Sequence, residues 1–174
     1  MNKPMPDIAF KFMSLGFKFR DLLRPRKNIL KEAGINTGFH VLDYGCGPGS
    51  YLTAVSAMAG ETGKIYALDA HPLAIKMVQR IVSGKHFTNL ETILSDCKTG
   101  LPDNSLDIIL LYDTLHGLEN LDCVLEEFGR TLKPDGILSV SDHHLKEVEL
   151  VSRVTDKGLF RLLRKGENTY SFTK

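Results

Sequence analysis

Three glycines alternate with other residues directly after a short apolar run that ends in an acid. The run is Val41-Leu42-Asp43, and Gly45, Gly47 and Gly49 follow at every second position. Glycine permits a sharp turn with positive φ, and without a Cβ it lets a ligand approach the backbone closely. A strand, a glycine turn and a helix open the nucleotide-binding unit of many α/β domains. This stretch is therefore the first candidate for a cofactor site.

The spacing of the glycines separates two classes of cofactor. A dinucleotide turn, G-x-G-x-x-G, would need a third glycine where this chain has Ser50. The order here, D-x-G-x-G-x-G, resembles the first motif of the class I S-adenosylmethionine-dependent methyltransferases. The resemblance implies S-adenosylmethionine as cofactor, with its methionine end at the following helix N-terminus, where amide donors and the dipole favour a carboxylate. The implied contacts in this loop are Asp43, Gly45, Cys46, Gly47, Gly49 and Tyr51.

A second acid ends the next predicted strand, residues 64–69. Asp69 lies 20 residues after Gly49, and a carboxylate at this place can accept both hydroxyls of a ribose. The alternative role is an N-cap for the following helix, but His71-Pro72 already provides the helix start. We therefore assign Asp69, with Ala70 beside it, to the adenosine part of the cofactor.

Further motifs in the same order extend the resemblance over residues 39–173 and point to methyltransferases of the ubiquinone/menaquinone-biosynthesis kind (types 11 and 25). Asp96-Cys97, after a predicted strand at 90–95, looks like the family's adenine-contacting pair. Residues 101–107 are similar to the family's L-P-x-x-x-x-D loop, and residues 132–138 to its L-K-P-D-G-x-L string. The main chain of Tyr112, at the end of an apolar strand, is expected to be a further cofactor contact.

The fold predicted is α/β, a Rossmann-like doubly wound sheet of seven strands, mostly parallel with an antiparallel C-terminal strand. In the strand predicted at 107–112, the residues after Asp107 are apolar without a break, as in a parallel strand that helices cover on both faces. Gly166-Glu167-Asn168 separates two strand-like segments and predicts a closing hairpin. A proline-to-glycine turn at 134–136 should separate the helix at 121–132 from the fifth strand, and Gly84 should end the helix that begins at Pro72.

The length of the chain predicts one domain, which the motifs divide into a core and an N-terminal arm. Residues 35–174 form the cofactor-binding core, and residues 1–34 form an N-terminal arm with a short helix at 25–33. Four of the nine phenylalanines fall between positions 10 and 19 of the arm. The arm is either a lid over a lipophilic substrate or a segment that packs on the sheet edge, and the sequence leaves both open.

Histidines follow two of the strands whose ends should face the cofactor. His116, His143 and His144 are candidate general bases, and we select His116 and His143 as catalytic residues. Each could instead cap a strand end or be merely exposed. With Asp113 or Asp142 they could bind a metal, but nothing in the sequence fixes the ligand spacing, so no metal is expected.

Composition narrows the remaining choices. The three cysteines are an odd number without C-x-x-C spacing, which predicts a reduced, cytoplasmic protein without disulfides or a zinc finger. No apolar run approaches the length of about 20 residues that spans a membrane, and no signal peptide is recognisable. Residues 1–31 and 153–174 are basic, with balances of +6 and +4, and residues 32–152 are acidic, with a balance of −9. The basic ends are either solvated helix faces or an anion-contacting surface.

The function expected is methyl transfer from S-adenosylmethionine to a small, lipophilic or aromatic acceptor. The alternative is a non-catalytic S-adenosylmethionine-binding module that docks RNA or a protein through its basic ends. Methylation of a nucleic-acid base is disfavoured, because Tyr112-Asp113-Thr114-Leu115 replaces the N/D-P-P-Y/F motif. A homodimer is possible, although no residue selects it.

Overall fold

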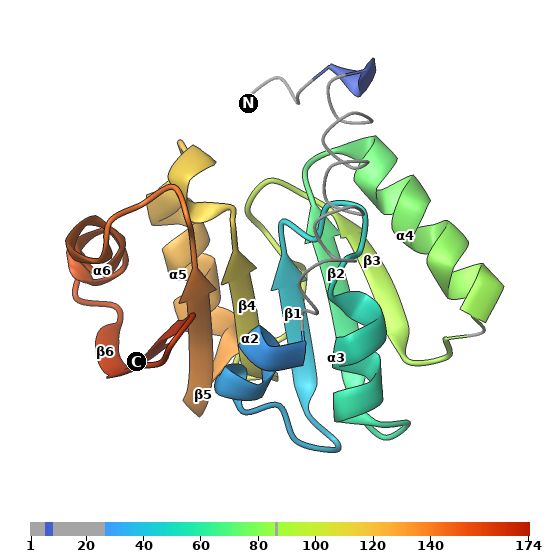
Figure 1. The fold of residues 1–174 in the computed structure, drawn as a ribbon, viewed down its shortest axis with the longest axis horizontal. Coiled ribbons are helices and arrows are strands. Elements are labelled where there is room, and N and C mark those ends of the chain that lie inside the picture. The colour runs from blue at the N-terminus through green and yellow to red at the C-terminus, as the bar shows by residue number, and fades with distance from the viewer. Residues whose placement is uncertain (1–5, 9–26, 86) are drawn as a thin grey trace.

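The computed structural model of the chain describes residues 6–8, 27–85 and 87–174. Seven strands form one sheet in the order β3-β2-β1-β4-β5-β7-β6 (Figure 1). The strands are β1 (His40–Tyr44), β2 (Lys64–Asp69), β3 (Leu90–Leu94), β4 (Leu106–Tyr112), β5 (Leu132–Ser141), β6 (Arg161–Lys165) and β7 (Tyr170–Thr173). β7 pairs antiparallel with both β5 and β6, and the strands from β3 to β5 pair in parallel. The predicted doubly wound sheet with an antiparallel C-terminal strand is confirmed.

Helices cover both faces of the sheet. The helices are α2 (Lys27–Ala33), α3 (Leu52–Ala59), α4 (Pro72–Lys85), α5 (Leu121–Thr131) and α6 (Glu147–Thr155), with a short 3-10 helix, η1 (Leu115–Gly117). One apolar cluster joins α2, α3 and Val78 of α4 to the first face, and a second joins α5 and α6 to the other. Figure 1 shows α2 and α3 in front of the central strands.

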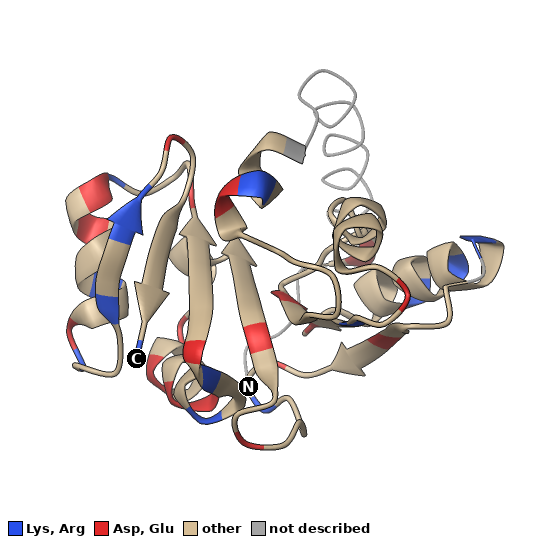
Figure 2. Ribbon diagram, turned by 90° about the horizontal axis from the view of Figure 1, so that it is seen from below, with Lys and Arg blue, Asp and Glu red and all other residues tan. Residues whose placement is uncertain are grey.

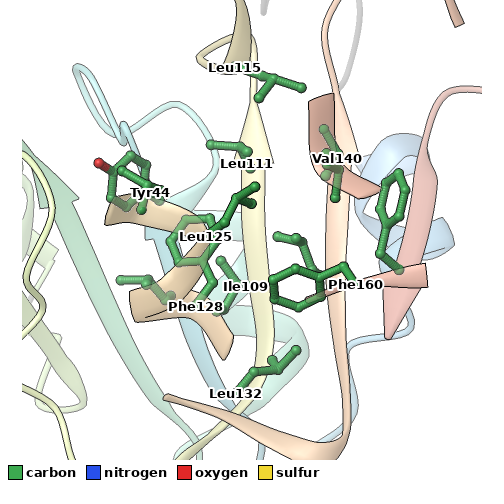
Figure 3. Packing of buried hydrophobic residues seen from close by; sticks show 14 of the residues in the cluster. Tyr44, Ile109, Leu111, Leu115, Leu125, Phe128, Leu132, Val140 and Phe160 are labelled. Atoms are coloured by element: carbon green, nitrogen blue, oxygen red, sulfur yellow. The ribbon is translucent and has the colours of Figure 1, made fainter. Parts of the chain in front are cut away.

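The strand β4 contributes to both clusters because successive side chains of a strand point to opposite faces. Ile108 and Leu110 pack with α3, whereas Ile109 and Leu111 pack with α5. Figure 3 shows Ile109 and Leu111 beside Leu125 and Phe128 of α5. An apolar stripe at helical spacing on α5 and an unbroken apolar strand thus produce the central layer of the core, as the sequence predicts.

Two predicted boundaries are wrong. Helix α4 continues to Lys85, so that Gly84 lies inside the helix and does not end it. Strand β5 begins directly at Leu132 and includes the residues expected to form a turn. Its register with β4 shifts after Leu132, which allows Pro134 to lie at an irregularity where no ladder hydrogen bond is lost.

The prediction of reduced cysteines is also wrong. Cys97, after β3, and Cys123, on α5, form a disulfide, while Cys46 is a buried free thiol. The number and spacing of the cysteines could not reveal this pair, because its members are distant in sequence and close in the fold. The cysteines therefore no longer support the predicted cytoplasmic location.

Removing this disulfide is expected to lower the free energy of unfolding by about 3 kcal/mol, because the bridge closes a loop and restricts the unfolded chain. The bonded residues are 26 apart in sequence. Urea denaturation of the oxidised protein and of a Cys97→Ser/Cys123→Ser variant would measure the difference. Dithiothreitol should shift the midpoint of the wild type and leave that of the variant unchanged. Equal midpoints for oxidised and reduced wild type would contradict the prediction.

Helix α2 is attached to the closing hairpin by one carboxylate. The oxygens of Glu32 accept hydrogen bonds from the backbone N–H and side-chain amide of Asn168 and from the backbone N–H and hydroxyl of Thr169. Burial alone would raise the pKa of Glu32, but these donors outweigh it and lower the pKa. The backbone carbonyl of Glu32 accepts a further bond from Arg164. An early helix and a late hairpin are thereby joined.

Basic residues near the C-terminus lie on the edge strand β6 and at the end of the chain; Figure 2 shows blue bands of Lys and Arg on an otherwise tan edge strand. Arg164 binds the carbonyl of Glu32, and Lys165 pairs with Glu147 of α6. Lys174 donates to the carbonyls of Gly129 and Leu132. Because these cations contact this chain itself, their placement favours a structural role over an anion-binding one.

The proposed division into arm and core meets the structure only in part. The helix expected at 25–33 is present as α2, but most of the phenylalanine-rich arm lies outside the described residues. None of the helices in the described ranges is sufficiently long and apolar to cross a membrane.

Candidate functional site

The site lies where the direction of strand order reverses. β1 lies between β2 and β4, so the chain leaves β1 in one direction and returns to its other side at β4. In an open α/β sheet, ligands bind beyond the carboxyl ends of the strands at such a point. The acids expected at these ends are all present there. Asp43 is near the end of β1 and Asp69 ends β2, Asp96 lies two residues after β3, and Asp113 and Asp142 directly follow β4 and β5.

The glycine loop folds over the end of β2 and against the loop after β4. The backbone N–H groups of Gly45 and Cys46 both donate to the carbonyl of Leu68, at 2.8 and 3.0 Å. Gly45 has φ +73°, and a Cβ there would lie 2.4 Å from Oγ1 of Thr114. Gly45 is therefore required by the approach of another loop of the protein rather than by a ligand.

Gly47 differs from Gly45 in its surroundings. Its φ is +52°, and a Cβ built on it meets nothing within 4 Å. Its N–H donates to a carboxylate oxygen of Asp69 at 2.8 Å, which fixes the loop beside the acid that the sequence assigns to the adenosine. Open space beside a backbone with positive φ is what a closely bound cofactor needs.

The other predicted loop residues are mostly inside the protein. The thiol of Cys46 and the ring of Tyr51 are buried, and Tyr51 packs edge-on against Tyr112 with ring centroids 5.2 Å apart. The hydroxyl of Tyr112 is hydrogen-bonded to Ser139 at 2.8 Å. A Cβ on Gly49 would touch side chains of α3 and α4. The side chains of Cys46 and Tyr51 thus pack inside the protein, and the backbone of the loop is the part that remains for the cofactor.

Asp43 is a buried acid with an unsatisfied oxygen. Its residue is 2% exposed, and its Oδ2 has no hydrogen-bond partner. Burial, and secondarily the charge of Asp69, raises the pKa of Asp43 to about 7. A buried acceptor without a partner is costly to a protein, and a cationic or hydrogen-donating ligand group would remove that cost. This orphaned oxygen fits the ammonium group of a bound methionine moiety.

Asp69 has both carboxylate oxygens engaged with backbone. Oδ2 accepts from Gly47 and Oδ1 from His71, each at 2.8 Å. Burial raises the pKa of Asp69 despite these two bonds. His71 then caps α4, because its Nδ1 accepts from the N–H of Leu73 at 3.1 Å. Each Asp69 oxygen retains a further acceptor position, so the carboxylate can still receive two ribose hydroxyls.

The loop after β3 is positioned through its backbone. The carbonyl of Asp96 accepts from the hydroxyl of Tyr44 at 2.8 Å and from the side chain of Asn120 at 2.7 Å. Cys97 follows, with its N–H bonded to Ser95 Oγ and its sulfur in the disulfide to α5. The side chain of Asp96 is exposed, which leaves it accessible to an adenine amino group.

A buried acid on α5 holds the continuation of this loop. Glu127 is 1% exposed, and its Oε1 accepts from the N–H and hydroxyl of Thr99 at 2.8 and 2.6 Å. Arg130 donates to both its oxygens. Burial alone would raise the pKa of Glu127, but the bonds from Arg130 and Thr99 lower it to about 2. Sequence analysis missed this residue, although an acid among the apolar positions of α5 was a signal for it.

The three histidines lie together beyond β4 and β5. His116 Nδ1 is 2.9 Å from Oδ2 of Asp142, whose side chain is fully buried. His143 Nδ1 is 2.7 Å from Oδ1 of Asp113. The ring of His144 lies between them, 4.2 Å from the His116 ring and 3.9 Å from the His143 ring. Both selected histidines are thus paired with a carboxylate and exposed on their other side.

Comparison with known proteins identifies the kind of domain. A family model described as a methyltransferase domain matches residues 35–170. Demethylmenaquinone methyltransferase of Geobacillus stearothermophilus is 29% identical over 126 residues, which cover 72% of this chain and 54% of that protein. The ubiquinone/menaquinone biosynthesis C-methyltransferase UbiE of Pseudoalteromonas translucida is 28% identical over 140 residues, covering 79% and 56%. This chain spans little more than half the length of these relatives.

Solved structures give the same result. A SAM-dependent methyltransferase from Aquifex aeolicus superposes with a TM-score of 0.78 at 28% identity, covering 90% of this chain and 97% of that one. A structure described as a putative S-adenosyl-L-methionine-dependent methyltransferase from Methanococcus maripaludis has a TM-score of 0.78 at 15% identity, covering 100% and 96%. At that lower identity the likeness concerns the fold alone.

Proposed function

This chain belongs to the class I S-adenosylmethionine-dependent methyltransferases, and on that premise we propose that it methylates a small, lipophilic or aromatic acceptor. One observation carries the proposal: the His116–Asp142 pair lies beyond the ends of β4 and β5, and β4 is the direct neighbour of β1, which leads into the glycine loop. Methyl transfer to a hydroxyl or an enol needs a binding site for the methyl donor and a base close to it. Both would lie here beyond the carboxyl ends of the same strands.

The chain's own residues fit the cofactor at three places. Gly47 leaves open space beside its backbone, the orphaned oxygen of Asp43 suits an ammonium group, and Asp69 retains acceptor positions for the ribose. Asp96 and the backbone at Cys97 would contact the adenine. When bound, S-adenosylmethionine supplies an electrophilic methyl group on a sulfonium. The protein needs only to orient the acceptor and exclude water.

His116 is the base that the geometry favours. Asp142 accepts hydrogen bonds from both the backbone N–H and the Nδ1 side of His116, so the carboxylate fixes the ring orientation. With a proton on Nδ1, the opposite nitrogen is an acceptor that can take a proton from the acceptor molecule. His143 is paired with Asp113 in a similar manner, but its side chain is 60% exposed against 37% for His116.

The choice of acceptor draws on the relatives and on the N-terminal arm. The relatives described above are named as quinone-biosynthesis methyltransferases, which suggests a phenolic or quinol acceptor with an apolar substituent. The described part of the arm lies near the end of β2, where the cofactor is expected, because Oδ1 of Asp7 is 3.9 Å from Nε2 of His71. We propose that the phenylalanine-rich segment covers the acceptor. Deleting residues 1–20 should then abolish turnover and leave cofactor binding intact.

The test is methyl transfer followed by mass spectrometry. The full chain is incubated with S-adenosylmethionine and a panel of demethylated quinols, simple phenols and bulk RNA, with His116→Gln as the matched variant. Methylated quinol or phenol, formed far more slowly by His116→Gln, would support the proposal. Cofactor binding without product from any acceptor would favour the non-catalytic binding module instead, and methylated RNA would refute the small-molecule acceptor.

The affinity for S-adenosylmethionine is expected to rise with pH through 7. Asp43 has a folded-state pKa of about 7, so it is mostly protonated at pH 6 and ionised at pH 8. The ionised form attracts the ammonium group of the ligand, and Kd should therefore fall by about tenfold from pH 6 to pH 8. Calorimetric titration at several pH values measures this change. Asp43→Asn should remove most of the pH dependence of Kd. If Kd changes with pH as strongly in that variant, another group causes the change.

A further inference from the structure

Three potential metal ligands meet beyond β4 and β5. Asp113, Asp142 and His143 each offer one ligand atom, and these atoms all lie within 4.8 Å of one another. Their sequence positions are separated by a helix and a strand, which is why spacing alone could not indicate a site. The parallel pairing of β4 with β5 brings them together, with Tyr112 opposite Ser141 and the N–H of Asp113 bonded to the carbonyl of Ser141 at 2.7 Å.

The distances suit coordination. Oδ1 of Asp113 lies 2.7 Å from Nδ1 of His143. Two adjacent ligands of an octahedral cation, each about 2.1 Å from the metal, are about 3 Å apart. A cation can therefore replace the proton between this oxygen and this nitrogen with a movement of a few tenths of an ångström. The third ligand, Asp142, is within reach without rearrangement of the strands.

The buried carboxylate of Asp142 is already oriented by its neighbours. Its Oδ2 accepts from the backbone N–H of His116 at 3.0 Å, and its Oδ1 accepts from that of His144 at 3.0 Å. Hydrogen bonds that fix a ligating carboxylate are a regular part of metal sites. Oδ1 retains an acceptor position after this bond, so Asp142 can hold a cation and orient His116 at the same time.

The backbone of Asp113 is in an uncommon conformation. Its φ is +51°, and among the residues described only Asn104 shares a positive φ without being glycine. Aspartate tolerates this region better than most residues, yet the conformation still costs energy and recurs at functional sites. Here it accompanies a side chain that reaches across to His143 on the neighbouring strand end.

We propose that Asp113, Asp142 and His143 bind a first-row divalent transition-metal cation. Two ionised carboxylates and one neutral imidazole balance a charge of +2. A mixed oxygen and nitrogen set favours Zn²⁺, Mn²⁺ or Co²⁺ over Mg²⁺, which prefers oxygen ligands alone. Three protein ligands leave coordination positions for water or an acceptor oxygen, and the exposure of His143 keeps these positions accessible.

The position of the cation suggests its use. It would lie beside His116, at the edge of the sheet where the acceptor is expected. There it would bind a hydroxyl of the acceptor and lower its pKa, so that the oxygen or the conjugated ring becomes nucleophilic at neutral pH. This use rests on the proposed methyl transfer, whereas binding of the cation does not.

The experiment measures binding without any methyl donor. The full, tag-free chain is treated with a chelator, desalted and titrated with ZnCl₂ by calorimetry, and with CoCl₂ by visible absorption. We expect one cation per chain. Asp113→Asn and His143→Gln should each weaken binding by more than about tenfold, because even outer groups of metal sites have effects of that size. Loss of cobalt absorption in the same variants would place the ion at these side chains.

Two matched variants control for adventitious binding. His40→Gln removes a histidine at the start of β1, at the opposite end of the sheet, and Asp122→Asn removes an exposed acid of α5. Both should bind the cation like the wild type, and circular dichroism should show all variants folded. The proposal is overturned by absence of stoichiometric binding, or by equal affinity of the wild type and Asp113→Asn. Methyl transfer failing on every acceptor would leave this result unaffected, so the two hypotheses can fail separately.

Discussion

In a calorimetric titration, Asp69→Ala is expected to bind S-adenosylmethionine about 100-fold more weakly than the wild type. Hydrogen bonds to a charged group contribute about 1.5–3 kcal/mol each, and on the proposed assignment the carboxylate of Asp69 accepts two ribose hydroxyls. The same loss should occur with S-adenosylhomocysteine, which has the same ribose. NADH should not bind either protein appreciably, since Ser50 stands where a dinucleotide turn has glycine. Wild-type affinity in the variant would contradict the assignment of Asp69.

The substitution also removes two backbone contacts of Asp69, so a second ligand is needed to separate the two effects. Asp69 accepts from Gly47 and His71, and the loop loosens when these bonds are lost. The 2′,3′-dideoxy analogue of S-adenosylhomocysteine has no hydroxyls to offer. If the ribose contact is direct, the wild type should lose affinity for this analogue and the variant should not distinguish the two ligands. Equal discrimination by both proteins would show that Asp69 acts only on the loop.

Replacement of Glu127 by alanine is expected to destabilise the fold by about 3–5 kcal/mol, the usual cost of breaking a buried ion pair. Thr99 would lose the acceptor for its buried N–H and hydroxyl, and Arg130 would lose its bidentate partner. For a domain of this size the unfolding temperature should fall by roughly 10 °C. Glu126→Ala, on the exposed side of the same helix, is the control and should change little. Similar melting of the two variants would contradict the prediction.

The same carboxylate predicts acid sensitivity. The pKa of Glu127 is about 2 in the folded state, below its ordinary value of 4.5. A carboxyl group whose pKa is lower in the folded state adds fully to the free energy of unfolding above its unfolded-state pKa. That contribution is lost as pH falls from about 4.5 towards 2. Denaturant unfolding between pH 5 and pH 3 should therefore show a steeper decline for the wild type than for Glu127→Gln. Parallel declines would place the acid sensitivity elsewhere.

The features that were predicted correctly depend on local sequence patterns. The unbroken apolar run of β4 indicated burial on both faces, and Ile108 and Ile109 indeed pack in different clusters. The D-x-G-x-G-x-G order indicated the family, which the family model confirms. Gly166-Glu167-Asn168 indicated the hairpin that closes the sheet. Each depends on residues within a few positions of one another, where periodicity and turn chemistry suffice.

The features that were missed depend on contacts between distant segments. The bond between Cys97 and Cys123 joins a loop and a helix. Thr114, which makes Gly45 necessary, belongs to another strand end. The early start of β5 follows from its pairing with β4, which overrode the turn preference of Pro134. Contacts between distant segments determine these three features, and the local sequence pattern does not reveal such contacts.

The candidate base and metal ligands fall between these two groups. Their residue types and their place after β4 and β5 were predictable, and His116 and His143 were chosen on that ground. Their partners were not, because the choice between Asp113 and Asp142 depends on how the two strand ends lie side by side. The structure pairs His116 with Asp142 and His143 with Asp113.

The contact between Glu32 and the closing hairpin also bears on how the protein is made. Its donors lie 136 and 137 residues further along the chain, so α2 leaves the ribosome long before its partners exist. Contacts of such long sequence separation form late and slow folding. The early helix should therefore attach only after residues 168–169 have been synthesised. A nascent chain arrested before the hairpin should remain sensitive to protease near α2.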